Sequence, residues 1–405
     1  MPEKNKTLNL FVCAGESSGD LHAAHVVECL HKQLPADINL EIWGMGGKKL
    51  QDQNIDLVQD STDLGVIGIA EILKKLFFFI DLERRLIEEI KKRKPDFALL
   101  IDYPGLNLRL AAKIKKVLPT CKVLFYVAPQ VWAWNKKRIY KIPKIVDKLY
   151  PILPFEEALH KSVGTNVKFL GNPSANVLNE LSKTFNRSQY LESVGLDFSM
   201  PLISLFPGSR PRTTSLVLPD MLQAAKILGK KFPKIQFVLV KSSTAELGQI
   251  KRLVEEAEMG DCKFVVLDYP HNHSVLLSST VAWLASGTVT LEAACANTPL
   301  IVGNRESWIY FLMFKHFIKI NVTGFKDARI IGLPNLIAGE IICPEILQHD
   351  CNAEQWAGIT ENWLSNPEEL AKIKKNLKEK VIDQLQPELD PAHEIAKDIL
   401  LMFGE

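Results

Sequence analysis

The sequence predicts an α/β protein of two doubly wound domains, each built on a parallel sheet. A chain of 405 residues is too long for one compact core and suggests about two domains. Short apolar runs alternate with helical patterns along most of the chain, which is typical of parallel strands covered by helices on both faces. The alternation breaks at residues 171–186 (GNPSANVLNELSKTFN), where we expect the chain to cross between the domains.

The expected strands are short apolar runs, because parallel strands buried on both faces form continuous hydrophobic segments. In the first domain these runs are Leu8–Cys13, Leu40–Trp43, Phe97–Ile101 and Val123–Val127. In the second domain they are Leu202–Phe206, Ile235–Val240, Phe264–Leu267, Val281–Ala285 and Pro299–Val302. The tail Ala353–Phe403 has the spacing of amphipathic helices, divided by Asn366-Pro367 and by the turn QPELDP.

Composition and charge disfavour several classes of protein. A formal net charge of +2 gives no global electrostatic argument for nucleic acid. The seven scattered cysteines have neither metal-ligand spacing nor the density of a disulfide scaffold, which fits a reducing cytoplasm. The first residues contain no apolar segment of signal-peptide length. The charged stretch Leu64–Ile80 is shorter than the ~20 apolar residues that span a bilayer, so we expect it to lie on a membrane without crossing it.

The turn after the first strand is the first candidate site, since ligands of doubly wound sheets bind outside the carboxyl ends of the strands. Gly15 and Gly19 would free the backbone there. We expect Ser18 or Asp20 to cap the following helix. The spacing is neither G-x-G-x-x-G nor a P-loop, which argues against a dinucleotide fold or an ATPase. An ordinary turn and a ligand-binding turn remain equally open.

The segment SGTVTLE, after the expected strand Val281–Ala285, is the second candidate. Ser286 or Gly287 would turn the chain, and Thr288 would open a helix whose free amides favour a phosphate. Glu292 lies one turn later, where its carboxylate can accept hydrogen bonds from both hydroxyls of a ribose. The alternative is a serine cap followed by a solvated glutamate.

Arg210, in the segment PGSR, is the third candidate. Its guanidinium is a rigid, always charged fork that suits phosphate oxygens, although a plain surface arginine is the alternative. The sequence contains no Asp-x-Asp, the usual metal clamp of sugar transferases. We therefore expect no metal and no other cofactor, with Arg210 and helix amides neutralising a departing nucleoside diphosphate.

Asp102 follows the apolar run FALLI, which places a carboxylate at a strand end in the first domain. It could take a proton from a hydroxyl nucleophile, or it could merely cap the turn.

Aromatic and histidine residues give weaker signals. We expect Trp132 and Trp134 to form core and cleft wall, and His271 and His273 to be solvated. The chain has no HExxH and no G-x-S-x-G, which disfavours metallohydrolases and serine hydrolases.

Eight stretches carry a resemblance to a known family. They are AGESSGD, LGVIGIAEIL, IDYPGLN, YVAPQVWAW, PFE at Pro154, PGSR, LASGTVTLEAA and LPNLIAG. Most are weak alone, but their number and order are specific and run nearly from end to end. In them the chain resembles the lipid-A-disaccharide synthases, which are glycosyltransferases of the GT-B type.

The resemblance implies two Rossmann-like domains facing each other across a cleft, one of 1–177 with a returning C-terminal helix at about 385–405, the other of 178–384. It implies transfer of 2,3-diacylglucosamine from UDP to the 6-hydroxyl of 2,3-diacylglucosamine 1-phosphate, with inversion to a β-1,6 link and without a metal. The product would be lipid A disaccharide 1-phosphate.

Site residues follow from the resemblance position by position. Asp102 matches the family's candidate base. The positions around UDP are Arg210, Ser286, Gly287, Thr288, Glu292 and Asn335, of which Asn335 rests on the resemblance alone. The loop on the acceptor side contains Gly15, Glu16, Ser18 and Gly19. We expect Glu16 to be less important for the reaction than Asp102, because a carboxylate beside an anionic acceptor would repel the acceptor.

Because its substrates would carry acyl chains, we expect the enzyme to meet them at a bilayer surface. The helical spacing predicts membrane or acyl contacts from Ile72, Leu73, Leu76 and Phe77, with Phe79 or Ile80, whereas a core helix is the alternative. The basic run Asn135–Lys148 would attract anionic lipid, and Trp308–Ile320 is a second candidate for acyl contact. We expect a cytoplasmic protein, peripheral on the inner face of the inner membrane, with no nucleic-acid partner. The family association suggests a homodimer.

Two other functions stay open. The same GT-B cleft would suit a UDP-N-acetylglucosamine epimerase or a transferase with a soluble acceptor. A noncatalytic nucleotide or lipid carrier would bind a UDP-sugar without releasing UDP. An acid, an arginine and a glutamate at strand ends argue against a mere carrier.

Overall fold

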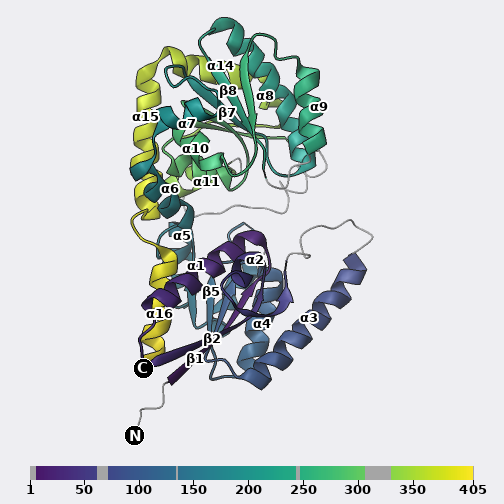
Figure 1. The fold of residues 1–405 in the computed structure, drawn as a ribbon, viewed down its shortest axis with the longest axis vertical. Coiled ribbons are helices and arrows are strands. Elements are labelled where there is room, and N and C mark those ends of the chain that lie inside the picture. Colours follow the sequence, from purple (N-terminus) through teal and green to yellow (C-terminus); the bar gives the residue numbers. More distant parts are fainter. Residues whose placement is uncertain (1–5, 62–71, 134–135, 243–246, 306–329, 405) are drawn as a thin grey trace. The chain divides into compact units, whose positions relative to one another are not determined.

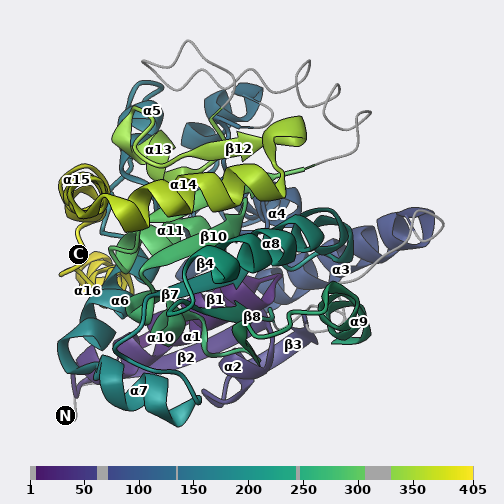
Figure 2. The ribbon, with the colours of Figure 1, turned by 90° about the horizontal axis from the view of Figure 1, so that it is seen from above.

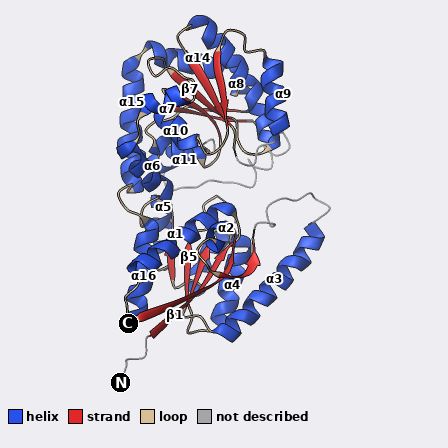
Figure 3. Ribbon diagram, in the orientation of Figure 1, coloured by secondary structure: helices blue, strands red, loops and turns tan. Residues whose placement is uncertain are grey.

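The protein is described by a computed structural model over residues 6–61, 72–133, 136–242, 247–305 and 330–404. The chain divides into two compact units, Met1–Pro173 with Leu389–Glu405, and Ser174–Glu388, called unit 1 and unit 2 below. Each unit contains a six-stranded parallel sheet with helices on both faces (Figures 1 and 3). The predicted class, two doubly wound parallel-sheet domains, is therefore confirmed.

Unit 1 has the strand order β3-β2-β1-β4-β5-β6. Its strands are β1 (Lys6–Ala14), β2 (Ile38–Gly46), β3 (Asp56–Asp60), β4 (Phe97–Ile101), β5 (Lys122–Tyr126) and β6 (Lys148–Tyr150). Its helices are α1 (Ser17–Gln33), α2 (Lys48–Gln51), α3 (Ile72–Arg93), α4 (Pro104–Val117), α5 (Pro154–Lys161) and α16 (Pro391–Gly404), with 3₁₀ turns at Lys136–Tyr140 and Ile142–Lys144.

The two faces of this sheet are buried against different helices. Side chains alternate along each strand, so Phe11 and Cys13 of β1 point to one face while Leu10 and Val12 point to the other. Helices α3 and α4 cover the first face, and α1 and α16 cover the second. The chain's last helix thus belongs to the core of unit 1, where it packs against the first helix.

Unit 2 has the strand order β12-β11-β10-β7-β8-β9. Its strands are β7 (Leu202–Phe206), β8 (Gln236–Val240), β9 (Lys263–Leu267), β10 (Val281–Ala285), β11 (Leu300–Asn304) and β12 (Glu345–Leu347). Its helices are α6 (Pro173–Thr184), α7 (Arg187–Ser193), α8 (Pro211–Lys231), α9 (Leu247–Ala257), α10 (Asn272–Ser278), α11 (Val289–Cys295), α13 (Leu333–Ala338), α14 (Ala353–Ser365) and α15 (Pro367–Leu377). Short turns follow at Gln348–Asp350, Lys378–Ile382 and Asp383–Leu385.

The core of unit 2 is built mainly between its sheet and the helices α8 and α14, which lie side by side in Figure 2. Trp283 of β10 donates a hydrogen bond from Nε1 to Thr360 Oγ1 of α14 at 2.8 Å. Its ring lies 5.7 Å from that of Trp356. Helices α10 and α11 contact the sheet as well, and they carry the site residues discussed below.

Both sheets reverse their strand order at the same place. In unit 1 the first strand, β1, pairs with β2 and β4, and in unit 2 β7 pairs with β8 and β10. In doubly wound sheets the loops on the two sides of this switch point diverge and leave room for a ligand. The turns after β1 and β4, and after β7 and β10, are therefore the places to look for a site.

Every strand predicted from an apolar run is present, whereas β3, β6 and β12 were not predicted. All three are sheet edges. They are short or polar, as in the sequence DLVQD of β3, because an edge strand needs no continuous apolar run.

Candidate functional site

The turn after β1 lies against the turn after β4. A Cβ built on Gly15 would fall 2.5 Å from two ring carbons of Tyr103, so only glycine leaves room for that ring. Neither Gly15 nor Gly19 has a positive φ, so the expectation that they free the backbone is wrong. Around Gly19 a Cβ would make only ordinary contacts, at 3.6 Å from Ile101. Glu16 and Ser18 are exposed on this turn.

The predicted cap of α1 by Ser18 or Asp20 is also wrong. The N-cap is Glu16, and its side chain makes no capping bond. Asp20 is buried one turn into α1 and caps a different helix, α2, by accepting bonds from the backbone N–H groups of Gly47 at 2.7 Å and Lys49 at 2.9 Å. Glycine at 47 makes this approach possible, since a Cβ there would lie 2.8 Å from the carboxylate.

Asp102 and Tyr103 follow β4 in the left-handed backbone region, with φ of 48° and 46°. This conformation costs roughly 1–2 kcal/mol for each non-glycine residue. The Asp102 N–H donates to Tyr126 O at 2.9 Å, so the turn is tied to the end of β5. Val127, just beyond β5, is left-handed as well, at 62°. Backbone strain of this kind tends to gather at functional sites.

Two acidic residues, Glu16 and Asp102, belong to the two turns at this edge of unit 1. Burial raises the pKa of Asp102, against a smaller opposite effect from the Tyr103 N–H. Partial burial and the charge of Asp102 raise the pKa of Glu16. A half-buried carboxyl at a strand end, with its pKa moved toward neutrality, is a candidate general base.

The corresponding edge of unit 2 carries a cation. Gly208 has φ of 99°, and a Cβ on it would lie 3.4 Å from Ala285 Cβ, so the turn after β7 packs on the end of β10. Arg210 is the N-cap of α8 and is exposed. Its guanidinium has no hydrogen bond or ion pair with any residue that the structure describes. An exposed guanidinium at the start of a helix is a suitable binding group for an anion.

The turn after β10 presents Ser286, Gly287 and Thr288, and Thr288 is the N-cap of the seven-residue helix α11. Gly287 and Thr288 are exposed. Glu292 lies one turn further along and is not solvated as the alternative would have it: its Oε2 accepts a bond from Asn272 Nδ2 at 2.9 Å.

The two histidines expected to be solvated are partly buried and paired, so that expectation is wrong. His273 Nε2 lies 3.6 Å from Glu292 Oε2. His271 Nδ1 shares a 3.0 Å hydrogen bond with the Tyr190 hydroxyl. Asn272 and His273 are site candidates that sequence reasoning missed, because their partner is 19 or 20 residues away and the only signal was polarity at the start of a helix.

Asn335 uses its whole amide within unit 2. Its Nδ2 donates to Cys343 O at 2.8 Å and Glu345 Oε1 at 2.7 Å, and its Oδ1 accepts from the N–H groups of Ile342 and Cys343. These four bonds fill the hydrogen-bonding capacity of an asparagine side chain. Asn335 is 1% exposed and holds the start of α13 to β12. Its predicted contact with UDP would need one of these bonds to open.

Trp132 lies in the core as expected, 7% exposed. Its Nε1 donates to Glu156 Oε1 at 2.9 Å, in the segment PFE. Burial raises the pKa of Glu156 to about 8. Trp134 lies outside the described residues.

The predicted membrane contacts are described only in part. Phe77 is 71% exposed and Ile80 is 52% exposed on α3, while Phe79 packs toward the core and lies 6.2 Å, ring to ring, from Tyr103. The side chains of Ile72, Leu73 and Leu76 and the segment Trp308–Ile320 lie outside the described residues. No helix in the described ranges combines the length and apolarity that crossing a bilayer requires.

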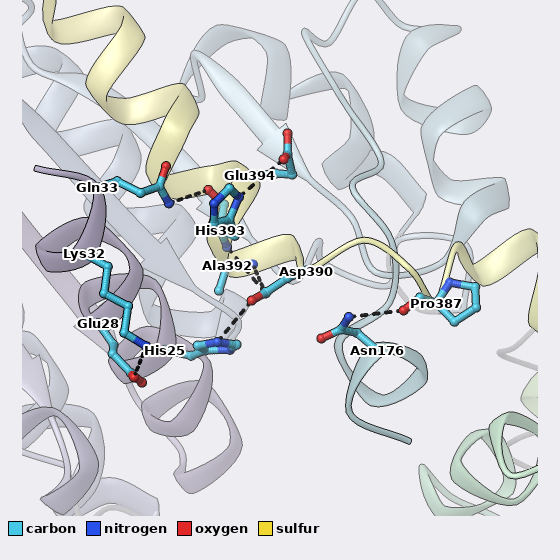
Figure 4. Close-up of polar contacts among 10 residues, drawn as sticks. All are labelled: His25, Glu28, Lys32, Gln33, Asn176, Pro387, Asp390, Ala392, His393 and Glu394. Atoms are coloured by element: carbon cyan, nitrogen blue, oxygen red, sulfur yellow. Dashed lines mark hydrogen bonds and ion pairs between the residues drawn. The ribbon is translucent and has the colours of Figure 1, made fainter. Parts of the chain in front are cut away.

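One group of potential metal donors occurs among the described residues: His25 and Cys29 of α1 with Asp390, whose ligand atoms lie within 4.8 Å of one another. Figure 4 shows that Asp390 is already engaged, by His25 Nε2 at 3.2 Å and by the Ala392 N–H that it caps at 2.9 Å. These contacts fasten the start of α16 to α1. The group lies in the middle of α1 and not at the switch point.

Comparison with known proteins places the chain. Residues 10–400 match the family described as lipid-A-disaccharide synthetase. The lipid-A-disaccharide synthase of Trichlorobacter lovleyi is 35% identical over 353 residues, 86% of each chain. That of Coxiella burnetii (strain CbuK_Q154) is 33% identical over 385 residues, 94% of each chain.

Solved structures agree on the fold. A UDP-GlcNAc 2-epimerase from Neisseria meningitidis bound to UDP-GlcNAc matches with a TM-score of 0.61 at 14% identity, over 98% of this chain and 100% of that chain. A glycosyltransferase from Rickettsia africae matches with a TM-score of 0.56 at 13% identity, over 98% of both chains. At such identities the likeness concerns the fold, a pair of Rossmann-like domains of the GT-B type. The family match and relatives above 30% identity show more: the chain belongs to the lipid-A-disaccharide synthase family.

Proposed function

We propose that this protein joins UDP-2,3-diacylglucosamine to 2,3-diacylglucosamine 1-phosphate through a β-1,6 link, with inversion and without a metal, and releases UDP. Family membership supports the reaction class. The observation that carries the assignment of roles is the pair of switch points, acidic in unit 1 and cationic in unit 2.

In unit 1, Asp102 is the proposed base. Its carboxylate takes the proton of the acceptor's 6-hydroxyl while that oxygen attacks the anomeric carbon of the donor sugar. The new bond between carbon 1 and oxygen 6 forms as the bond from carbon 1 to the UDP oxygen breaks. A base with a raised pKa suits this step, because a weakly basic carboxylate would hold the proton poorly.

In unit 2, Arg210 and the turn Ser286–Thr288 would hold the diphosphate, and Glu292 would bind the ribose. The departing UDP carries the electron pair of the broken bond, so cationic and N–H donors stabilise it. Asn272 occupies one oxygen of Glu292, which leaves its second oxygen for the ribose hydroxyls. Asn335 would act on UDP indirectly, by holding the start of α13.

In the acceptor loop, Gly15, Glu16, Ser18 and Gly19 would approach the acceptor sugar. The exposed Phe77 and Ile80, the basic turn Lys136–Tyr140 and the predicted contacts Ile72, Leu73 and Leu76 would hold the protein at the inner face of the inner membrane. A homodimer belongs to the same proposal.

The test is an assay of the purified protein in detergent with both acylated substrates, with and without EDTA. We expect UDP and a β-1,6 disaccharide, identified by its anomeric NMR coupling, at the same rate in both conditions. Loss of activity with EDTA would refute the metal-free reaction. A preference for unacylated UDP-GlcNAc, or binding without UDP release, would instead indicate the epimerase, soluble-acceptor or carrier alternatives.

A further inference from the structure

Asn107, in the first part of α4, joins three carbonyl groups at the switch point of unit 1. Its Nδ2 donates to Asp102 O at 2.8 Å, to Ile101 O at 3.1 Å and, more weakly, to Cys13 O at 3.4 Å. Cys13 lies near the end of β1, and Ile101 is the last residue of β4. One fully buried amide thus spans the two strands at the point where the strand order reverses.

The other half of this amide has no partner. Asn107 Oδ1 is buried without a hydrogen bond to any described residue. Exchanging the amide nitrogen and oxygen would aim the oxygen at three carbonyls, so the orientation is determined. An orphaned buried acceptor costs free energy, whereas a leucine, which has the same branched shape and no polar atoms, would carry no such cost. The unpaired oxygen of Asn107 therefore lowers the stability of the fold. The N–H donors of the same amide hold the turn that contains Asp102.

The same residue closes that turn through its backbone. The N–H groups of Leu106 and Asn107 both donate to Tyr103 O at 3.1 Å. Asp102 and Tyr103 are consecutive left-handed residues, and such a pair persists only where the surroundings over-determine it. Asn107 contacts the carbonyls on both sides of this strained pair, through its side chain at Asp102 and its backbone at Tyr103.

We propose that Asn107 is the positioning residue for Asp102: its buried amide holds the left-handed turn that presents the carboxylate at the edge of the sheet. This inference rests on the proposed role of Asp102 as the base. Asn107 is the last residue of the stretch IDYPGLN, but the sequence alone does not indicate that its side chain bonds to the turn of Asp102.

The ionisable groups around this turn must be considered in any titration. They are Glu16 on the turn after β1, Cys13 in β1, Tyr103 itself, and Arg109 of α4, which pairs with Glu83 of α3 at 3.1 Å. Burial raises the pKa of Cys13 to about 12, so this thiol stays neutral where the carboxyls titrate. Burial raises the pKa of both Glu16 and Asp102, so the variant Asp102→Asn is used to identify which carboxyl gives each NMR signal.

The experiment compares Asn107→Leu with wild type in the full chain. Leu110→Ala is the matched control, since Leu110 is a fully buried residue of the same helix whose apolar side chain cannot donate a hydrogen bond to the turn's carbonyls. Two readouts are used: NMR titration of the Asp102 carboxyl carbon, assigned with Asp102→Asn, and the pH dependence of kcat with KM for the UDP-sugar. If Asn107→Leu does not fold, Asn107→Ser replaces it. The serine side chain is too short to donate hydrogen bonds to all three carbonyls.

For Asn107→Leu we expect the Asp102 titration and the acid limb of kcat to move down toward the ordinary aspartate range, as the turn relaxes into solvent. We expect kcat to fall at least tenfold while KM for the UDP-sugar stays within about twofold, because the donor residues are in unit 2. Leu110→Ala should lower the melting temperature and leave both pH readouts unchanged.

An unchanged Asp102 titration in Asn107→Leu, or an equal shift in Leu110→Ala, would overturn the proposal. The NMR readout needs no turnover, so it decides the role of Asn107 even if the wild type makes no disaccharide. That last result would refute the proposed function alone.

Discussion

The two units share one strand order but differ in what they place at the switch point. In unit 1 the turn after β4 is formed by two left-handed non-glycine residues, Asp102 and Tyr103, and the edge is acidic. In unit 2 the turn after β7 uses Gly208 for its left-handed position, and the edge carries the exposed Arg210. Unit 1 therefore combines backbone strain with acidic side chains. Unit 2 combines an unstrained turn with a cationic side chain.

This difference shows how one architecture can serve two chemical tasks. Strain requires a rigid surrounding, and unit 1 supplies it with the Tyr103 ring over Gly15 and the Asn107 amide beneath the turn. The diphosphate site that we propose in unit 2 needs accessible positive charge and N–H donors, which an exposed arginine on a relaxed turn can supply. The comparison predicts that substitutions in unit 1 act on the chemical step and those in unit 2 act on donor affinity.

The largest expected effect is that of Asp102→Asn in unit 1. Removing a general base should lower kcat by about 10²- to 10⁴-fold, with KM for the UDP-sugar little changed. Steady-state kinetics with a circular dichroism control for folding would measure it. Turnover within a few-fold of wild type would remove Asp102 from the chemistry.

Arg210→Ala in unit 2 should act differently. The loss of a charge-assisted hydrogen bond of about 1.5–3 kcal/mol corresponds to a loss of donor affinity of roughly 10- to 160-fold. Arg252→Ala, on the exposed face of α9, serves as the control for loss of one positive charge. If both variants bind UDP equally well, Arg210 lies outside the donor site.

The pH dependence should belong to unit 1. Because the base must be ionised, kcat should rise with pH through the pKa of Asp102, which burial raises above 3.8. The free energy of unfolding should change with pH in the opposite direction. A carboxyl whose pKa is raised in the folded state stabilises the fold at pH values below its unfolded-state pKa. This contribution is lost as the pH rises through the folded-state pKa. Asp102→Asn should therefore gain stability relative to wild type between acidic pH and pH 8, in urea unfolding. An unchanged difference across this range would contradict the burial.

The smallest expected effect concerns Asn272, which holds Glu292 in unit 2. Asn272→Ala removes one hydrogen bond to the carboxylate and should weaken UDP-sugar binding about 2- to 10-fold. Asn272→Asp, which cannot donate and repels Glu292, should be worse. Isothermal titration calorimetry would measure the affinity of each variant for the UDP-sugar. Affinities equal to that of wild type would mean that the hydrogen bond from Asn272 to Glu292 does not contribute to binding.

The central strands and the turns that follow them could be predicted from the sequence, because continuous apolar runs end there in glycine, serine or aspartate. The functions of single polar residues within those turns could not. Asp20 caps α2 and not its own helix. Gly15 leaves room for the ring of a residue 88 positions away. Asn335 uses its amide for hydrogen bonds to β12 and to neighbouring backbone groups. Each of these depends on a tertiary contact that no local pattern contains. Edge strands such as β3 escaped prediction since they need no apolar run.

The central claim is that donor binding belongs to unit 2 and proton removal to unit 1. Titration of UDP into Asp102→Asn and Arg210→Ala, alongside turnover of both, tests it most directly. We expect Asp102→Asn to bind UDP as wild type does while turnover is lost, and Arg210→Ala to lose UDP affinity. Equal loss of UDP binding in both variants, or full turnover in Asp102→Asn, would contradict it.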